Sequence, residues 1–169
     1  VMASSSLPPA KRAAASLRLA RAAGTQGMVG GQVLDLAWAG RRLGGGDLKC
    51  LHSLKTGALI SAAAAAGAEA AGASRVLVGR LEKYGRLLGL AFQVVDDVLD
   101  VEGTAASLGK TPGKDRKKKM FTFVDLLGVR GARDYARRLG AQALEALPKR
   151  GLHCQILSAL ARFVVEREH

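Results

Sequence analysis

The chain divides into apolar, often Ala-rich segments that are separated by short stretches of Gly, Pro or capping residues. Each segment predicts a helix, because Ala favours helices while Gly and Pro interrupt them. The breaks fall at Gly24, Gly44–Gly46 and Pro148, and Asp47 and Ser74 are predicted to cap the helices that they open. The expected helices are Pro9–Ala23, Met28–Arg42, Asp47–Leu54, Thr56–Gly72, Ser74–Val101, Phe121–Leu127, Arg130–Leu147 and His153–Glu166.

Three glycines recur at helical intervals within one of these segments: Gly79, Gly85 and Gly89. They are predicted to allow close contact with another helix, despite a cost of up to about 1 kcal/mol each relative to Ala. Residues 103–119 are predicted to form a flexible basic loop, rich in Gly, Thr and Lys. Every other connection is short.

The composition favours an all-α class. Hydrophobic residues make up 49% of the 169 residues and aromatic residues only 4%, and Ala is abundant. This balance favours closely packed helices over a β-sandwich. The length fits a single domain over residues 1–169, large enough to bury a core. The longest strongly apolar run, 58–68, is too short for a bilayer, which needs about 20 residues.

Cysteine usage and the N-terminal segment bear on the compartment. Cys50 and Cys154 lie far apart, without the spacing of a zinc site, which is typical of a reducing environment. No secretory signal is visible, so a cytoplasmic location is expected. The Ser-, Ala- and Arg-rich segment from Ser4 to Arg21 leaves a plastid transit remnant as the alternative to a surface helix. Val1 in place of a starting Met indicates truncation.

The formal net charge of +12 points to an anionic partner. Residues 110–119 hold six basic residues and one acid, a local charge of about +5. Such a field attracts diphosphates, and it also attracts nucleic acid. Aromatic residues are sparse and no DNA- or RNA-binding pattern is present, so a basic nucleic-acid-binding protein is the less favoured alternative. Retention on DNA with a steep salt dependence would be its sign.

Three carboxylates stand in an apolar segment that ends at Asp100. At helical spacing Asp96 and Asp100 lie on one face, and Asp97 lies three residues before Asp100, so all three are predicted to converge. Like charges held this close raise their pKa values or recruit a cation, and oxygen-only ligands suit Mg2+. Mg2+ shares its coordination positions with substrate phosphates, which predicts a phosphorylated ligand. An acidic helix end before a turn at Gly103 is the alternative.

Four segments resemble the trans-isoprenyl diphosphate synthases of the polyprenyl synthetase family, which make geranyl, farnesyl and geranylgeranyl diphosphates. The run Phe92–Asp100 is similar to the family's second aspartate-rich motif, and Leu108–Asp115 follows it with G-K-T and G-K-D. Gly27–Leu36 and Leu51–Leu59 resemble the G-Q-x-x-D-L and H-x-x-K-T-G-A-L segments, in the family's order. The first aspartate-rich motif is absent. The resemblance therefore covers the C-terminal half only, and it implies an incomplete antiparallel helical bundle of the isoprenoid synthase type.

The resemblance also implies roles for individual residues. Lys55 and Thr56 would contact the allylic diphosphate, and their expected place at a helix start favours an anion. Gln93 would lie beside the reacting centre. Without the resemblance, these positions read equally well as a surface lysine beside a helix cap and a satisfied core amide. The implied catalytic residues are Lys55, Thr56, Gln93, Asp96 and Asp97; the substrate-binding residues are Lys55, Thr56, Gln93, Lys110 and Lys114 in a closing loop, and Gln32 and Asp35 along the prenyl cavity; and the metal ligands are Asp96, Asp97 and Asp100.

The implied reaction is ionisation of an allylic diphosphate, attack on the cation by the double bond of isopentenyl diphosphate, and loss of a proton, with Mg2+ as cofactor. It requires no nucleophile, so His52, His153 and His169 are expected to be structural or exposed. Met120 stands where the family usually carries a lysine. We expect the isolated chain to be inactive. The resemblance also implies a homodimer, or a heteromer with a prenyl synthase subunit. A noncatalytic subunit of an active synthase is the alternative.

Overall fold

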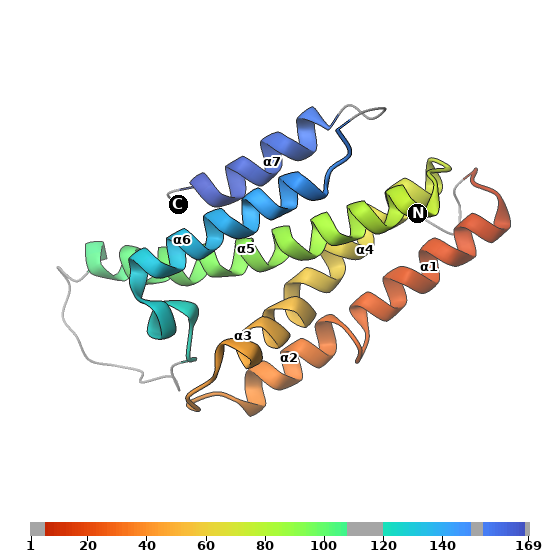
Figure 1. Ribbon diagram of the computed structural model, residues 1–169. Coiled ribbons are helices and arrows are strands. Elements are labelled where there is room, and N and C mark those ends of the chain that lie inside the picture. The colour runs from red at the N-terminus through yellow and green to blue at the C-terminus, as the bar shows by residue number, and fades with distance from the viewer. Residues whose placement is uncertain (1–5, 108–119, 150–153, 168–169) are drawn as a thin grey trace.

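Figure 1 shows the computed structural model, which describes residues 6–107, 120–149 and 154–167. Within these residues the regular secondary structure is entirely helical, which confirms the predicted all-α class. None of the described helices is both long and apolar enough to cross a membrane. In chain order the elements are α1 (Pro9–Ala23), α2 (Met28–Ala37), α3 (Gly45–His52), the π-helical turn η1 (Ser53–Gly57), α4 (Ala58–Ala70), α5 (Arg75–Ser107), α6 (Phe123–Ala146) and α7 (Gln155–Glu166).

The long helix α5 lies at the centre of the arrangement, with α4 and α1 on one side and α6 and α7 on the other (Figure 1). The turn η1 joins α3 to α4, and it packs against both α2 and α5. The second half of α5 is therefore bordered by elements from three separate parts of the chain. These are the α3–η1 segment, the start of α6 and the end of α7.

Two expected boundaries near α5 and α2 are wrong. Helix α2 ends at Ala37, five residues before the expected end, and Gly40 follows with a φ of 78°. Helix α5 continues to Ser107, so the first part of the loop expected over residues 103–119 is helical. The two guanidinium hydrogen bonds that Arg133 of α6 donates to Glu102 support this end of α5.

The break expected between two helices near residue 128 is present as a kink inside α6. Gly128 has a φ of 70° and a ψ of 165°, which lie outside the helical region. Glycine adopts a positive φ without the steric cost that a side chain would bring. The expected interruption is therefore confirmed at this residue, although helical structure continues on both sides of it.

Of the two predicted helix caps, one is confirmed. Ser74 Oγ accepts the backbone N–H of Leu77 at 3.3 Å, as an N-cap does. Asp47 is not the N-cap of α3, because Gly44 takes that place. The Asp47 carboxylate instead accepts the N–H of Gly44 at 3.0 Å, from the third helical position.

Helices α4 and α5 approach so closely that their backbones nearly touch. A Cβ at Gly85 would lie 2.6 Å from Ser61 Cα, and a Cβ at Gly89 would lie 2.6 Å from Gly57 Cα. The predicted close contact is therefore confirmed at these two glycines. It is wrong at Gly79, where a Cβ would meet nothing within 4 Å.

Polar side chains of α5 tie α6 and α7 to it. The Tyr84 hydroxyl donates to the carbonyl of Leu157 on α7 at 2.7 Å. The Arg80 guanidinium donates to the carbonyls of Ala146 and Leu147 at 2.9 and 2.8 Å. Because the last carbonyls of a helix have no partner within the helix, Arg80 satisfies the end of α6.

Candidate functional site

The second half of α5 is oriented by its buried valines. Val94, Val95 and Val98 are each 2% exposed or less and belong to the main core. With these three side chains turned inward, Asp96 and Asp97 come to lie at the edge of the core, where both are half-buried. Carboxylates in such a position need donors or cations around them.

Asp97 takes its donor from the start of α6. The backbone N–H of Phe123 donates to Asp97 Oδ2 at 2.9 Å. Burial raises the pKa of Asp97 to about 6; the Phe123 hydrogen bond opposes the rise, and the nearby Asp100 and Asp96 add to it. The carboxyl cluster is therefore short of positive charge.

The N–H that Asp97 accepts is presented by a capped helix end. Thr122 Oγ1 accepts the N–H of Asp125 at 3.2 Å, while Asp125 Oδ2 accepts the N–H of Thr122 at 3.0 Å. This reciprocal pair is a capping box, which satisfies donors that a helix start leaves free. The N–H of Phe123, a further donor of this helix start, bonds to Asp97 on α5.

His52, expected to be structural or exposed, is 8% exposed and lies beside the aspartates. Its Nε2 is 3.8 Å from Asp97 Oδ2. Burial lowers the pKa of His52 to about 4, and the charge of Lys55 adds to the fall. The imidazole is therefore neutral near pH 7 and does not neutralise Asp97. Neither ring nitrogen has a hydrogen bond of good geometry to a described residue, although Gln93 lies close enough to oppose the fall in pKa.

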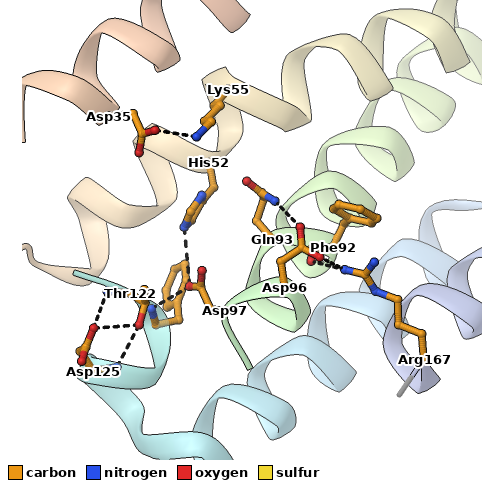
Figure 2. A network of polar contacts seen from close by, with 11 residues as sticks. Asp35, His52, Lys55, Phe92, Gln93, Asp96, Asp97, Thr122, Asp125 and Arg167 are labelled. Atoms are coloured by element: carbon orange, nitrogen blue, oxygen red, sulfur yellow. Dashed lines mark hydrogen bonds and ion pairs between the residues drawn. The ribbon is translucent and has the colours of Figure 1, made fainter. Parts of the chain in front are cut away.

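Asp96 is held from two sides. Gln93 Nε2 donates to Asp96 Oδ2 at 2.9 Å, and the guanidinium of Arg167 donates to Asp96 Oδ1. The same Arg167 nitrogen donates to the carbonyl of Phe92 at 3.2 Å, and the guanidinium carbon lies 4.0 Å from the centre of the Phe92 ring. Figure 2 shows Arg167 reaching from the end of α7 across to α5.

Lys55 lies in η1 and pairs with α2, its Nζ 2.6 Å from Asp35 Oδ2 (Figure 2). The two elements are in close contact, since a Cβ at Gly31 would lie 2.3 Å from the backbone nitrogen of Lys55. The expected helix start at this point is wrong, because His52 already has helical φ and ψ and η1 continues α3 into α4. Any attraction for an anion here comes from the Lys55 side chain. Single π turns of this kind are frequent at functional sites.

The predicted meeting of Asp96, Asp97 and Asp100 at one point is not seen. Asp96 turns to Arg167 and Asp97 to the start of α6, since each like-charged carboxylate finds its own donor. Among the residues that the structure describes, no three His, Cys, Asp or Glu side chains are arranged to hold a metal ion. The donor set nevertheless fits Mg2+. It consists of carboxylate oxygens on one helix, half-buried at Asp96 and Asp97 and exposed at Asp100, and burial together with like charge raises the pKa of Asp97.

The remaining predicted site residues lie apart from this cluster. Thr56 is half-buried in η1, and Gln32 is exposed on α2. Met120 is half-buried just before α6. Lys110 and Lys114 fall outside the described residues.

A cavity of about 600 Å³ lies between α1, α4 and α5, and it holds none of the predicted site residues. Arg18 crosses it to pair with Glu69, and Glu82 and Arg86 also line it. Its charged groups are largely paired with each other. The carboxylates of α5 are therefore the better candidate for the chemistry.

Fold and site together define an all-α protein that carries a half-buried aspartate pair on its central helix, and the family follows from a comparison with known proteins. The Polyprenyl synthetase family model matches residues 9–151. The chain therefore belongs to the polyprenyl synthetase family, as its motifs indicated.

The relatives and solved structures agree with this assignment. The dimethylallyltranstransferase of Fischerella ambigua is 42% identical, over 90% of this chain and 44% of that protein. The farnesyl diphosphate synthase of Escherichia coli is 44% identical, over 88% of this chain and 51% of that protein. A Helicobacter pylori geranyltransferase complexed with magnesium and isoprenyl diphosphate has a TM-score of 0.73 and 31% identity, over 97% of this chain and 52% of that one. The isoprenoid synthase type of bundle is thus confirmed, and the chain spans about half the length of these relatives.

Proposed function

We propose that this chain provides one metal-binding side of a Mg2+-dependent prenyl diphosphate synthase, which joins an allylic diphosphate to isopentenyl diphosphate. The observation that carries the proposal is the Asp96–Asp97 pair on α5, which lies beside His52 of α3 and Gln93 (Figure 2). His52 is a perturbed histidine within reach of Asp97, but burial lowers its pKa to about 4, which makes the imidazole a weak base near pH 7. The neutral imidazole leaves the charge of Asp97 available.

The residues of the site would divide the work of holding a charged substrate. Asp96 and Asp97, with Asp100 one turn further on, would hold Mg2+. When bound, the metal would supply positive charge to the diphosphate leaving group. Lys55 would add a second positive charge from η1. Its present partner Asp35, at 2.6 Å, keeps the ammonium group in place until an anion competes for it.

Gln93 has a separate role in this proposal. Its amide nitrogen donates to Asp96 Oδ2, which fixes the rotamer of that carboxylate. Its amide also lies beside His52. The amide oxygen would face positive charge that develops on the substrate. The magnesium and isoprenyl diphosphate named with the Helicobacter pylori structure agree with this assignment of ligands.

Calorimetry with inorganic diphosphate tests the binding site. We expect binding to the 169-residue chain that requires Mg2+ and falls at least tenfold in Asp97→Asn. Asp134→Asn is a matched control, since Asp134 is an exposed carboxylate of α6 that forms an ion pair with Arg137 of the same helix. Equal binding in the presence of EDTA would rule out the proposed site.

We also propose that the 169-residue chain alone does not turn over substrate. Asp96–Asp97 is its only pair of adjacent acidic residues, whereas the family ionises its substrate between two aspartate-rich motifs. Loss of one electrostatic donor typically lowers a rate by about 10²–10³, and loss of a whole metal-binding side should lower it further. An assay with radiolabelled isopentenyl diphosphate and dimethylallyl, geranyl or farnesyl diphosphate should show no product. Turnover by the chain alone would contradict this part of the proposal.

The alternative is a noncatalytic subunit that partners an active synthase. Exposed apolar side chains of α2 favour an association of this kind, since Val33 is 58% exposed and Leu36 is 71% exposed. Sedimentation of the chain, alone and mixed with an active short-chain synthase, distinguishes a homodimer from a heteromer. A cytoplasmic location stays a prediction, with the plastid as its alternative.

A further inference from the structure

Arg167 is the one described cation in direct contact with Asp96 or Asp97. It lies one residue beyond α7, and its side chain is only 14% exposed. Stacking on the Phe92 ring and hydrogen bonds to Asp96 and to the Phe92 carbonyl hold its guanidinium. Three contacts of different kinds on one guanidinium indicate a defined binding position for this side chain, unlike the single contact of an ordinary surface ion pair.

These contacts satisfy the hydrogen-bond donors of Arg167 only in part. One terminal nitrogen serves both acceptors, while Nε is buried without a hydrogen-bond partner among the described residues. A buried donor without a partner weakens the contact as a whole. A competitor for Asp96 can therefore displace the guanidinium more readily than it could displace a fully bonded arginine.

A divalent cation at Asp96 would be such a competitor. Both oxygens of the carboxylate already accept hydrogen bonds, one from Gln93 and one from Arg167. The free lone pairs would still allow a metal to approach, but it would stand within a few ångströms of the guanidinium. A divalent ion and a guanidinium about 4 Å apart in a half-buried site repel each other more strongly than two unit charges would, and more in protein than in water, so each disfavours the binding of the other.

We propose that Arg167 is the resident counter-cation of Asp96, and that docking of Arg167 and binding of a divalent metal at α5 disfavour each other. Arg167 is thus a positioning residue that sets the metal affinity of the site. The inference rests on the proposed metal site. By linkage, the factor by which docked Arg167 weakens the metal is also the factor by which the metal weakens the docking of Arg167.

Titration of the full 169-residue chain with Mn2+, with free Mn2+ followed by electron paramagnetic resonance, tests the proposal without any assay of activity. We expect Arg167→Met to bind Mn2+ about three- to tenfold more tightly than wild type. Arg167→Lys keeps the positive charge but loses the stacking and the forked hydrogen bonding of the guanidinium, so its affinity should fall between those of wild type and Arg167→Met. Arg162→Met removes the same charge from an exposed position on α7, and it should leave the affinity unchanged.

A second variant keeps the test independent of the fold of α7. Phe92→Leu removes the ring on which Arg167 stacks but leaves both charges of the ion pair in place. It should also tighten Mn2+ binding, by less than Arg167→Met does. Circular dichroism would verify that each variant keeps the helical content of wild type.

The outcomes separate the inference from the function on which it rests. Tighter binding in Arg167→Met and Phe92→Leu, with loss of binding in Asp97→Asn, supports both. Equal affinity in wild type and Arg167→Met overturns the inference but leaves the metal site intact if Asp97→Asn still loses binding. No Mn2+ binding by wild type or Arg167→Met, or binding that Asp97→Asn does not change, overturns the metal site itself. Tighter binding in Arg162→Met to the same degree would reduce the effect to net charge, and it too would overturn the inference.

Discussion

The two halves of α5 are held in place by different means. Up to Gly89, the backbones of α5 and α4 lie in direct contact, because Gly85 and Gly89 carry no side chains that would hold them apart. Beyond Gly89, α5 carries carboxylates that receive donors from the start of α6 and the end of α7. Both halves bury apolar side chains in the core, but only the first meets α4 backbone to backbone, and only the second carries these carboxylates.

This difference separates what stabilises the protein from what it could do. A contact between backbones tolerates no added atom, so the first half should be rigid and sensitive to any larger residue. Polar contacts at a half-buried surface can be exchanged for a ligand at modest expense in free energy. The second half is therefore the part of α5 suited to a binding site, and substitutions that contrast the halves test the distinction.

The largest effect is expected at the α4–α5 contact. In Gly89→Ala the new Cβ would meet Gly57 Cα at 2.6 Å, and the neighbour is backbone that cannot rotate away. We expect a loss of about 2–3 kcal/mol in the free energy of unfolding, even though Ala is the better helix former. Gly79→Ala is the matched control, since its Cβ meets nothing within 4 Å, and it should gain about 0.5–1 kcal/mol.

Urea unfolding followed by circular dichroism measures both glycine variants. The sign of the change is the informative quantity, because the two substitutions are chemically identical and lie on the same helix. Equal changes in the two variants would mean that α4 and α5 do not meet as closely as described here.

The second effect contrasts two replacements of Asp97 in metal-free buffer. Asp97→Ala leaves the N–H of Phe123 without its acceptor and should cost about 1–3 kcal/mol in the free energy of unfolding. Asp97→Asn keeps an oxygen for that N–H and removes a buried charge, so its stability should equal or exceed that of wild type. Thermal unfolding in EDTA compares the two. A loss in Asp97→Asn as large as that in Asp97→Ala would show that the charge itself stabilises this half of α5.

Much of the fold could be predicted from the positions of Gly, Pro and Ala. Helix α1 has the bounds expected from its flanking Pro9 and Gly24. The break expected near Gly128 is present as a kink, whereas α5 runs past Gly103, which was read as the end of a helix. Local signals give the intrinsic cost of a glycine, but whether a helix continues depends on what packs against it.

The candidate site could be predicted only in part. Spacing and motif were enough to select Asp96, Asp97 and Lys55, because these residues lie in local patterns. Arg167 is 71 residues from Asp96, and nothing in its neighbourhood indicates a partner on α5. The capping box of Thr122 was visible in the sequence as Thr and Asp three residues apart, but its use in aiming an N–H at Asp97 depends on the tertiary fold.

Tyr84 is one of the polar residues in the first half of α5 that bond to other helices, and it allows a pH test. Burial, with a smaller contribution from the nearby Cys154, raises the pKa of Tyr84 to about 12, above its ordinary value of 10. A raised pKa means that the stabilisation is complete below pH 10 and is lost as the pH rises toward 12, by about 1 kcal/mol per pH unit. Tyr84→Phe should be about 1–1.5 kcal/mol less stable at pH 8, because the bond to Leu157 is gone, and it should lack this additional loss at high pH. Parallel pH profiles for the two proteins would refute the raised pKa of the buried Tyr84 hydroxyl.

The smallest effect concerns the helix cap that serves Asp97. Thr122→Ala removes the hydroxyl that accepts the N–H of Asp125, and it should cost about 0.5–1 kcal/mol, while Thr122→Ser should restore most of that loss. The consequence for the site should exceed the change in stability. Fraying at Phe123 would let its N–H leave Asp97, and amide hydrogen exchange at that residue should become faster in Thr122→Ala than in Thr122→Ser. If exchange at Phe123 is the same in both variants, the start of α6 is held by packing alone, and the donor to Asp97 belongs to the rigid part of the protein after all.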